Sequence, residues 1–248
     1  DFLPIFDGGF SLQYSPLLEY REGQGLVVFY QMDVTGRTEN EPAADTLIRD
    51  LLSYVSAWTP EPRGEVVYAG DPAGRSFLAA LGIPVTSYAG GNLSRDQVLV
   101  VGPGGGPTLA SRATEIANWI TAGGNVLALG LDATDTKAWL PFPVTTKEAE
   151  HIATYFFPGT DRLLAGIGPA DVHNRAPRPL PLVAAGARPV GDGVLAIAEN
   201  ANVVFCQLAP WQFEGAQSNL RRTHRRASFL VSRLLANLGV AGSTPLLE

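Results

Sequence analysis

Two groups of side chains in this sequence are of types that bind ligands or move protons. Asp132 and Asp135 follow a short apolar run, and paired carboxylates at a strand end suit a metal ion or a sugar hydroxyl. His173 and Arg175 belong to the polar run DVHNR in a proline-rich segment, where an imidazole suits the lining of a cleft. Each group has a structural alternative, because aspartates also cap helices and a lone histidine also anchors a loop. No second histidine stands at metal-ligand spacing, so we predict no metal and no cofactor.

A glycine-rich loop and an aromatic pair are further candidates. The loop GPGGGP (102–107), with Gly104 and Gly105 at its centre, suits an anion at the start of a helix. It lacks the last glycine of a dinucleotide fingerprint and the Lys-Ser/Thr of a phosphate loop, so a tight structural turn is the alternative. Trp211 and Phe213 offer aromatic faces that stack on sugars, or that pack against a helix or a neighbouring module.

The run RRTHRR (221–226) is a basic cluster in a chain of net charge −6. It falls at a predicted helix start, where positive charge is unfavourable, so we expect salt bridges to another module or subunit, with solvated charge as the alternative. The acidic net charge and the lack of interleaved aromatics argue against a nucleic-acid partner. No apolar run approaches the ~18 residues of a membrane span, so no membrane partner is predicted.

Composition predicts a well-buried globular protein, since 46% of the 248 residues are hydrophobic and 17% are charged. The single cysteine, Cys206, cannot form an internal disulfide, and its apolar neighbours predict an inert core thiol. It leaves the compartment open, a secreted or periplasmic one included. The chain starts at Asp1 without a methionine, and we expect a fragment or a processed product.

The stretch Gln97–Gly130 is the element that must position most of these residues. Val98–Val101 reads as a buried strand, Ser111 as the cap of a helix that ends at Gly123-Gly124, and Val126–Leu129 as a second strand. Such a βαβ unit places its two strands parallel. A further strand, helix and strand over residues 65–88 extend the alternation. The predicted fold class is therefore α/β, with an open, mostly parallel, doubly wound sheet.

The rest of the chain predicts less regular parts. Residues 1–58 read as a hairpin (16–22 and 26–33, with a turn at 23–25) and a helix from Pro42, followed by a linker at 59–62. Residues 64–248 form the α/β domain, in which 141–192 is an irregular, proline-rich insertion with one edge strand at His151–Phe157. A C-terminal hairpin and helix at 193–239 close the domain.

The two ends of the chain repeat one another. VVFYQMD (27–33) matches VVFCQLA (203–209), and Leu47, Leu51 and Leu52 match Leu230, Leu234 and Leu235 of the later helix. Since hairpin and helix close the second module, residues 1–58 are predicted to close a preceding module whose opening is missing. Chance similarity between buried strands is the alternative.

These patterns resemble two families. The strand, Gly/Pro loop, Gly-Gly-ended helix and second strand over 64–140 resemble the class I glutamine-amidotransferase-like, flavodoxin-like fold, which the trimerisation domains of some β-galactosidases share. The segments 17–37 and 203–213 resemble tail regions of bacterial proteins related to glycoside hydrolase family 2. Active amidotransferases carry a cysteine on a sharp strand-to-helix turn. Here the equivalent turn is Gly130-Leu131-Asp132, with neither Cys nor Ser, so the resemblance implies the scaffold without the chemistry.

We therefore expect a non-catalytic accessory or scaffolding domain of a larger carbohydrate-active bacterial protein. Its expected partners are neighbouring modules or further copies of the chain, with carbohydrate as a candidate ligand. One alternative is a small-molecule hydrolase or a metal-dependent enzyme that uses Asp132, Asp135 and His173. The other is a sugar-binding module that uses Trp211 and Phe213.

Overall fold

The computed structural model describes residues 3–8, 14–22, 25–59, 64–157, 161–213 and 218–240. It divides the chain into two compact units, of which unit 1 consists mainly of Asp1–Glu61 and unit 2 is Pro62–Ser243. The predicted turn at Gly23-Gln24 and the predicted linker at Pro60–Pro62 lie outside the described residues.

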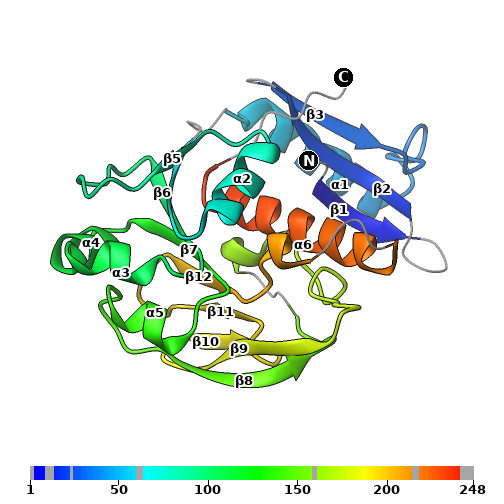
Figure 1. Ribbon diagram of the computed structural model, residues 1–248. Coiled ribbons are helices and arrows are strands. Elements are labelled where there is room, and N and C mark those ends of the chain that lie inside the picture. The colour runs from blue at the N-terminus through cyan, green and yellow to red at the C-terminus, as the bar shows by residue number, and fades with distance from the viewer. Residues whose placement is uncertain are drawn as a thin grey trace. The chain divides into compact units, whose positions relative to one another are not determined.

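Unit 2 is built on a mixed, mostly parallel sheet with helices, which confirms the α/β class (Figure 1). Its strands lie in the order β10-β11-β12-β7-β6-β4-β5, and the run from β12 to β5 is parallel while β10 and β11 are antiparallel. The strands are β4 (Glu65–Ala69), β5 (Val85–Ser87), β6 (Gln97–Val101), β7 (Asn125–Leu129), β10 (Arg188–Val190), β11 (Leu195–Ile197) and β12 (Val203–Cys206).

Helices cover both faces of this sheet. On one face α2 (Pro72–Ala80) and the long α6 (Ser218–Asn237) pack over one hydrophobic cluster, which includes Leu78 and Leu230 (Figure 1). On the other face α3 (Gly106–Ala110) and α4 (Ala113–Thr121) pack over a second cluster, which includes Ile116 and Phe205. The short α5 (Ala133–Lys137) follows β7. The continuous apolar runs of β4, β6 and β7 match a sheet that is buried on both faces.

Unit 1 is a three-stranded antiparallel sheet followed by one helix. Its strands lie in the order β1 (Leu3–Gly8), β2 (Tyr14–Glu22), β3 (Gly25–Tyr30), and α1 (Pro42–Ala57) follows. The hairpin and the helix that begins at Pro42 are where the apolar pattern places them, whereas β1 was not predicted. The described residues of α1 include no buried side chain.

The insertion at 141–192 is more regular than its prolines suggested. β8 (Thr145–His151) and β9 (Arg178–Ala185) form a two-stranded antiparallel ribbon, and a 3₁₀ turn spans Arg162–Leu164. The predicted edge strand at His151–Phe157 is wrong, because β8 ends at His151. Pro179 and Pro181 are accepted within β9 because a two-stranded ribbon consists of edge strands.

The predicted helix cap at Ser111 is also wrong. A separate short helix, α3, begins at Gly106-Pro107, where proline suits the first turn, and Ser111 is its C-terminal cap. α4 then begins after Arg112, which makes no side-chain cap. The parallel pairing of β6 with β7 is confirmed.

Candidate functional site

The carboxyl ends of β4, β6, β7 and β12 meet at one edge of the sheet, where ligands bind in open α/β folds. The strand order reverses between β4 and β6, because the chain runs from β4 outward to β5 and then returns to β6 on the other side. The loops after these two strands are joined directly. Gly102 N donates to Ala69 O (2.8 Å), and Asp71 N donates to Pro103 O (3.1 Å). The crevice expected at this point is thus bridged by backbone hydrogen bonds.

The Tyr68 side chain fills the same place. A Cβ at Gly70, Gly74 or Gly102 would collide with its ring or hydroxyl, so these three glycines make room for it. Tyr68 Oη donates to Asp71 Oδ1 (3.4 Å). Burial, followed by the charge and the hydrogen bond of Asp71, raises the pKa of Tyr68 well above its usual range, which keeps the hydroxyl neutral.

Asp71 is held by three donors from its own chain. Its Oδ1 also accepts from Gly74 N (2.7 Å), which caps α2, and its Oδ2 accepts from Trp211 Nε1 (3.1 Å). The Trp211 ring packs on Phe77, with ring centroids 5.7 Å apart. Trp211, a candidate for sugar binding, therefore positions a capping carboxylate, and its role toward a ligand stays a prediction. Sequence inspection offered no signal for the Tyr68–Asp71–Trp211 contact, since 140 residues separate Asp71 from Trp211.

A small hollow lies beside this cluster. It has a volume of about 270 Å³ and is lined by residues that include Asp71, Arg75, Ser87, Tyr88 and Thr108. This volume is at the lower limit of ligand pockets, which span roughly 300–1,000 Å³.

The turn after β7 has the shape of a strand-to-helix elbow. Gly130 has φ +62°, in the left-handed region, and its N donates to Cys206 O (2.9 Å) on the neighbouring β12. A Cβ at Gly130 would have Ala209 Cβ at 3.5 Å as its nearest neighbour, which is ordinary contact. The turn therefore has space for a side chain but holds none.

Asp132 and Asp135 make hydrogen bonds that hold the same turn. Asp132 Oδ1 accepts from Asp135 N (2.8 Å) and caps α5, while Asp135 Oδ2 accepts from Gly104 N (3.3 Å). Gly105 N donates to Gly102 O (3.0 Å), and a Cβ at Gly105 would collide with the backbone of Ala69. The structure thus brings Gly104, Asp132 and Asp135 together, and the hydrogen bond between Gly104 and Asp135 links the loop after β6 to the turn after β7. Whether they bind a ligand stays a prediction.

His173 and Arg175 lie on a different part of unit 2. His173 Nδ1 accepts from Arg226 Nη1 (2.8 Å), and Arg175 N donates to Thr223 Oγ1 (3.0 Å), so both fasten their loop to α6. Burial and the positive charges of Arg226, Arg175 and His151 lower the pKa of His173. None of the hydrogen bonds among the described residues joins this pair to Asp132 or Asp135. The contact with Arg226 gives one member of the basic cluster a partner within the same unit.

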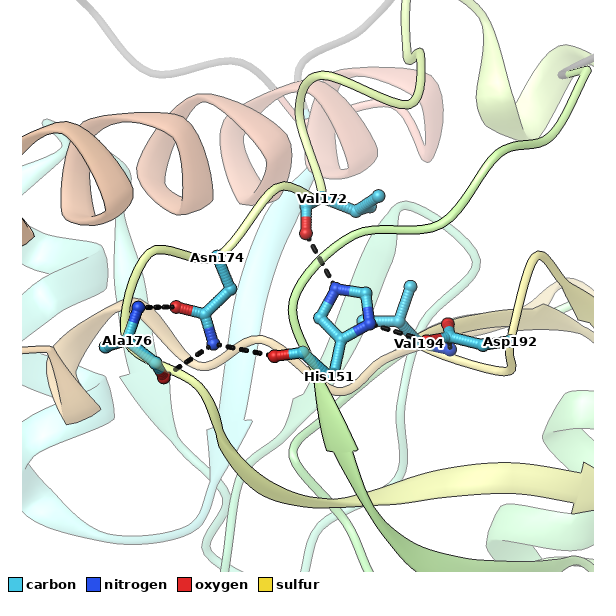
Figure 2. A network of polar contacts seen from close by, with 6 residues as sticks. All are labelled: His151, Val172, Asn174, Ala176, Asp192 and Val194. Carbon is cyan, nitrogen blue, oxygen red and sulfur yellow. Dashed lines mark hydrogen bonds and ion pairs between the residues drawn. The ribbon is translucent and has the colours of Figure 1, made fainter.

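A buried polar network holds the same loop from inside (Figure 2). His151 is fully buried, with Nδ1 2.6 Å from Asp192 Oδ2 and Nε2 2.7 Å from Val172 O. Asn174 Nδ2 donates to Ala176 O (3.0 Å), and Asn174 Oδ1 accepts from Ala176 N (2.8 Å). Asn174 Nδ2 also donates to His151 O (3.5 Å). Sequence inspection did not single out His151 or Asp192 for this role, because their pairing spans 41 residues.

Cys206 is completely buried in β12, and burial raises its pKa to about 12. A neutral, enclosed thiol is not a nucleophile. Phe213 is also buried, beneath the Arg178 guanidinium at 4.5 Å from its ring centroid, so it presents no sugar platform. Phe213 therefore packs inside unit 2, and packing was the alternative that the sequence analysis gave for it.

A larger cavity of about 500 Å³ lies at the opposite edge of the sheet. It is lined by residues that include Thr121, Phe142, Glu199 and Asn200, near the amino end of β12. In the part of the chain that the structure describes, no group of three or more His, Cys, Asp or Glu side chains is placed to hold a metal ion. Over the same residues, no helix combines the length and apolarity needed to cross a membrane.

Comparisons with known proteins give only distant likenesses. No family model matches the chain, and no curated protein matches it. Among solved structures, PurLQS from Thermotoga maritima aligns with a TM-score of 0.42 at 14% identity, over 69% of this chain and 99% of that one. A protein from Thermoplasma acidophilum that is described as part of a GMP synthase aligns with a TM-score of 0.40 at 11% identity, over 71% of this chain and 95% of that one.

A cold-adapted β-galactosidase from Rahnella sp. R3 also aligns, with a TM-score of 0.43 at 13% identity. The alignment covers 83% of this chain and 36% of the β-galactosidase, so this chain spans about a third of that protein. Likenesses at these identities transfer neither an activity nor a ligand.

Proposed function

We propose that this chain is a non-catalytic accessory module of a larger carbohydrate-active bacterial protein related to glycoside hydrolases. In this proposal unit 2 has the class I glutamine-amidotransferase-like fold, closed by the hairpin β11–β12 and by α6. Its work is to scaffold neighbouring modules or to contact further copies of the protein. The resemblance of segments 17–37 and 203–213 to tail regions of family 2-related proteins supports this context.

The turn after β7 is the observation that carries the proposal. In the amidotransferase-like fold this turn exposes the nucleophile, and a side chain there must tolerate φ > 0. Gly130 keeps the backbone conformation, and the surroundings would accept a Cβ, yet this position carries no side chain, and neither Cys nor Ser stands in residues 130–134. The nearby Cys206 is enclosed and protonated, so it does not substitute.

The filled crevice between β4 and β6 supports the same interpretation. Tyr68, three glycines and the Asp71–Trp211 bond occupy the place where a substrate binds in related architectures. These groups are uncharged or engaged by their own chain, which favours a rigid scaffold over a site that must admit and release ligands.

Deletion within the natural gene product tests the proposal. Removing residues 64–240 is expected to change the number of chains per assembly or to lower the melting temperature, while turnover per glycosidase site is retained. Light scattering, thermal unfolding and glycoside hydrolysis measure these three properties. Loss of turnover with an unchanged number of chains per assembly and an unchanged melting temperature would overturn the proposal.

A further inference from the structure

Unit 1 and the closing part of unit 2 share one topology. In unit 1 the strands β1-β2-β3 lie side by side and antiparallel, and α1 follows. In unit 2 the strands β10-β11-β12 lie in the same consecutive, antiparallel order, and α6 follows. The structural repeat is therefore longer than the hairpin and helix that the sequence repeat contains, because it includes the strand before the hairpin.

The two sets also share one register. Tyr30 and Cys206, which the sequence repeat aligns, pair with Leu17 and Leu195, so the hairpin pairing places Leu17 in correspondence with Leu195. One backbone hydrogen bond is reproduced outright, since Gln31 N donates to Pro16 O at 2.8 Å and Gln207 N donates to Val194 O at 2.8 Å.

The preceding strands agree as well. Pro4 lies opposite Leu18, and Pro189 lies opposite Ala196, the residue that corresponds to Leu18. β1 then shifts register twice, between Pro4 and Phe6 and between Phe6 and Gly8, whereas β10 keeps its register, so the agreement of the preceding strands is limited to Leu3 and Pro4. A one-residue slip at these positions would exchange the two faces of the strand, so this agreement favours duplication.

The two sets differ in what surrounds them. The far edge of β12 pairs in parallel with β7, whereas within the described residues β3 pairs with β2 alone. Phe205 is fully buried in the cluster that α4 covers, but the matching Phe29 is 41% exposed. On the helices, Leu235 is fully buried and the matching Leu52 is 63% exposed. At these matching positions, the apolar side chains of unit 1 are more exposed than those of unit 2.

The repeat also identifies which backbone groups of β3 are available. Val126 N donates to Asn202 O and Gly130 N donates to Cys206 O, both at 2.9 Å, so the even-numbered positions of β12 face β7. Their counterparts on β3 are Leu26, Val28 and Tyr30. The amides of these three residues point to the open edge, and those of the residues between them point to β2.

We propose that unit 1 is the closing half of a second module of the same fold. Its open β3 edge accepts a parallel, apolar strand equivalent to β7, and a helix equivalent to α4 covers Val27 and Phe29. The occupant is the opening half of that module, encoded ahead of Asp1 in the same polypeptide. The assembled protein then holds two such α/β modules in tandem, and unit 1 joins them.

Unit 2 of a second copy does not offer a strand that matches β3. β7 itself is enclosed between β6 and β12. The parallel strand at the free edge of unit 2, β5, has only three residues, and the side chains of Thr86 and Ser87 are exposed. The five-residue apolar β7 is the strand that corresponds in the repeat, so the opening half of another module is the occupant that the repeat favours, and pairing of β3 with the β3 of a second copy is an outcome that the test distinguishes.

Hydrogen–deuterium exchange on the 248-residue chain and on the natural gene product tests the proposal. In the chain alone, the amides of Val28 and Tyr30 should exchange at least ~100-fold faster than those of Val204 and Cys206. In the gene product, the amides of Val28 and Tyr30 should slow by at least ~10-fold, to join the protected class.

Val28→Pro separates docking from folding. Its amide faces the open edge, so proline removes no bond to β2 and is tolerated on an edge strand. It should leave exchange in the chain alone unchanged and should restore fast exchange at Tyr30 in the gene product. Glu39→Gln, at an exposed loop position of unit 1 outside the proposed interface, keeps every backbone amide, is the control and should change neither.

The other outcomes overturn the proposal. These are a gene product that begins at Asp1, fast exchange at Val28 and Tyr30 in a longer product, and slow exchange in the chain alone. In the last case, a dimeric mass would assign the edge to a second copy, and a monomeric mass would assign it to unit 2.

Discussion

His151 faces two hydrogen-bond acceptors at once, and this fixes its protonation. One ring nitrogen meets the Asp192 carboxylate and the other meets the Val172 carbonyl, so both bonds form fully only when both nitrogens carry protons. Burial lowers the pKa of His151, but the hydrogen bond to Asp192, the Val172 carbonyl and the charge of Asp192 outweigh it and raise the pKa. Burial alone would raise the pKa of Asp192. The hydrogen bond from His151, the charge of His151 and the hydrogen bond from the Val194 amide outweigh burial, so the pKa of Asp192 is lowered.

The sign of the resulting pH dependence follows from these directions. A histidine whose pKa is raised on folding stabilises the protein fully below its unfolded pKa, near 6.5, and this stability is lost as pH rises through the folded pKa. A carboxyl whose pKa is lowered stabilises above its unfolded pKa, near 3.8, and this is lost as pH falls through the folded pKa. The pair is therefore most stabilising between about pH 4 and pH 6.5.

His151→Gln should reduce the free energy of unfolding by about 1–3 kcal/mol near pH 6 and by less near pH 9. Urea titrations of both proteins at the two pH values measure the difference. His173→Gln is the control, and its effect on the free energy of unfolding should have the opposite pH dependence. The pKa of His173 is lowered on folding, so its neutral form is the stabilising one, and this contribution is lost as pH falls below its unfolded pKa. An effect of His151→Gln that grows toward pH 9 would refute the assignment.

At the scale of elements, Tyr68 and its glycines decide how closely α2 approaches the sheet. Gly74 lies inside α2, where alanine ordinarily favours the helix. A Cβ there would collide with the Tyr68 hydroxyl and would lie 2.8 Å from Trp211 Cζ2. The gain in helix propensity is therefore opposed by overpacking at the contact that closes the crevice.

Gly74→Ala should destabilise the protein by about 1–3 kcal/mol, against the gain expected from propensity. Combining it with Tyr68→Phe, which removes the hydroxyl, should recover part of that loss, and a double-mutant cycle from urea unfolding measures the coupling. Ser76→Ala, at an exposed position of the same helix, is the control and should change stability little. Additive effects of the two substitutions would show that the hydroxyl is not the obstacle.

The elements of unit 2 that pack both faces of the sheet were largely predictable, because buried strands and amphipathic helices leave strong periodic patterns. The apolar runs at β4, β6 and β7 and the glycines that end α2 and α4 indicated the βαβ alternation. The β8–β9 ribbon was missed because its paired residues lie 27 (His151 and Arg178) to 40 (Thr145 and Ala185) positions apart and because β9 contains two prolines. β1 was missed because it is short and precedes the hairpin that it joins.

Site residues were harder to interpret than elements. Asp132 and Asp135 were singled out from their place after a strand end, which is local information, whereas their contact with the Gly104 loop was not predicted and their role toward a ligand stays a prediction. The bonds of Asp71 with Trp211 and of His151 with Asp192 depend on tertiary distance, which one sequence does not contain.

At the scale of the whole molecule, both large hydrophobic clusters belong to unit 2. Every member of the two clusters has a number of 66 or above, so unit 1 contributes nothing to either. Unit 1 instead repeats the hairpin pairing of β11–β12, with Val27 and Phe29 partly exposed. This difference is the observation on which the proposed second module rests.

Hydrolysis by the 248-residue chain itself tests the central claim most directly. The claim is that the carboxyl edge of the sheet is filled by its own residues and lacks a nucleophile. Purified chain should release ammonia from L-glutamine, and nitrophenol from aryl glycosides, no faster than buffer does. Saturable release of either product that is lost in Asp132→Asn or His173→Gln would contradict the claim and establish an enzyme at this edge or at the α6 loop.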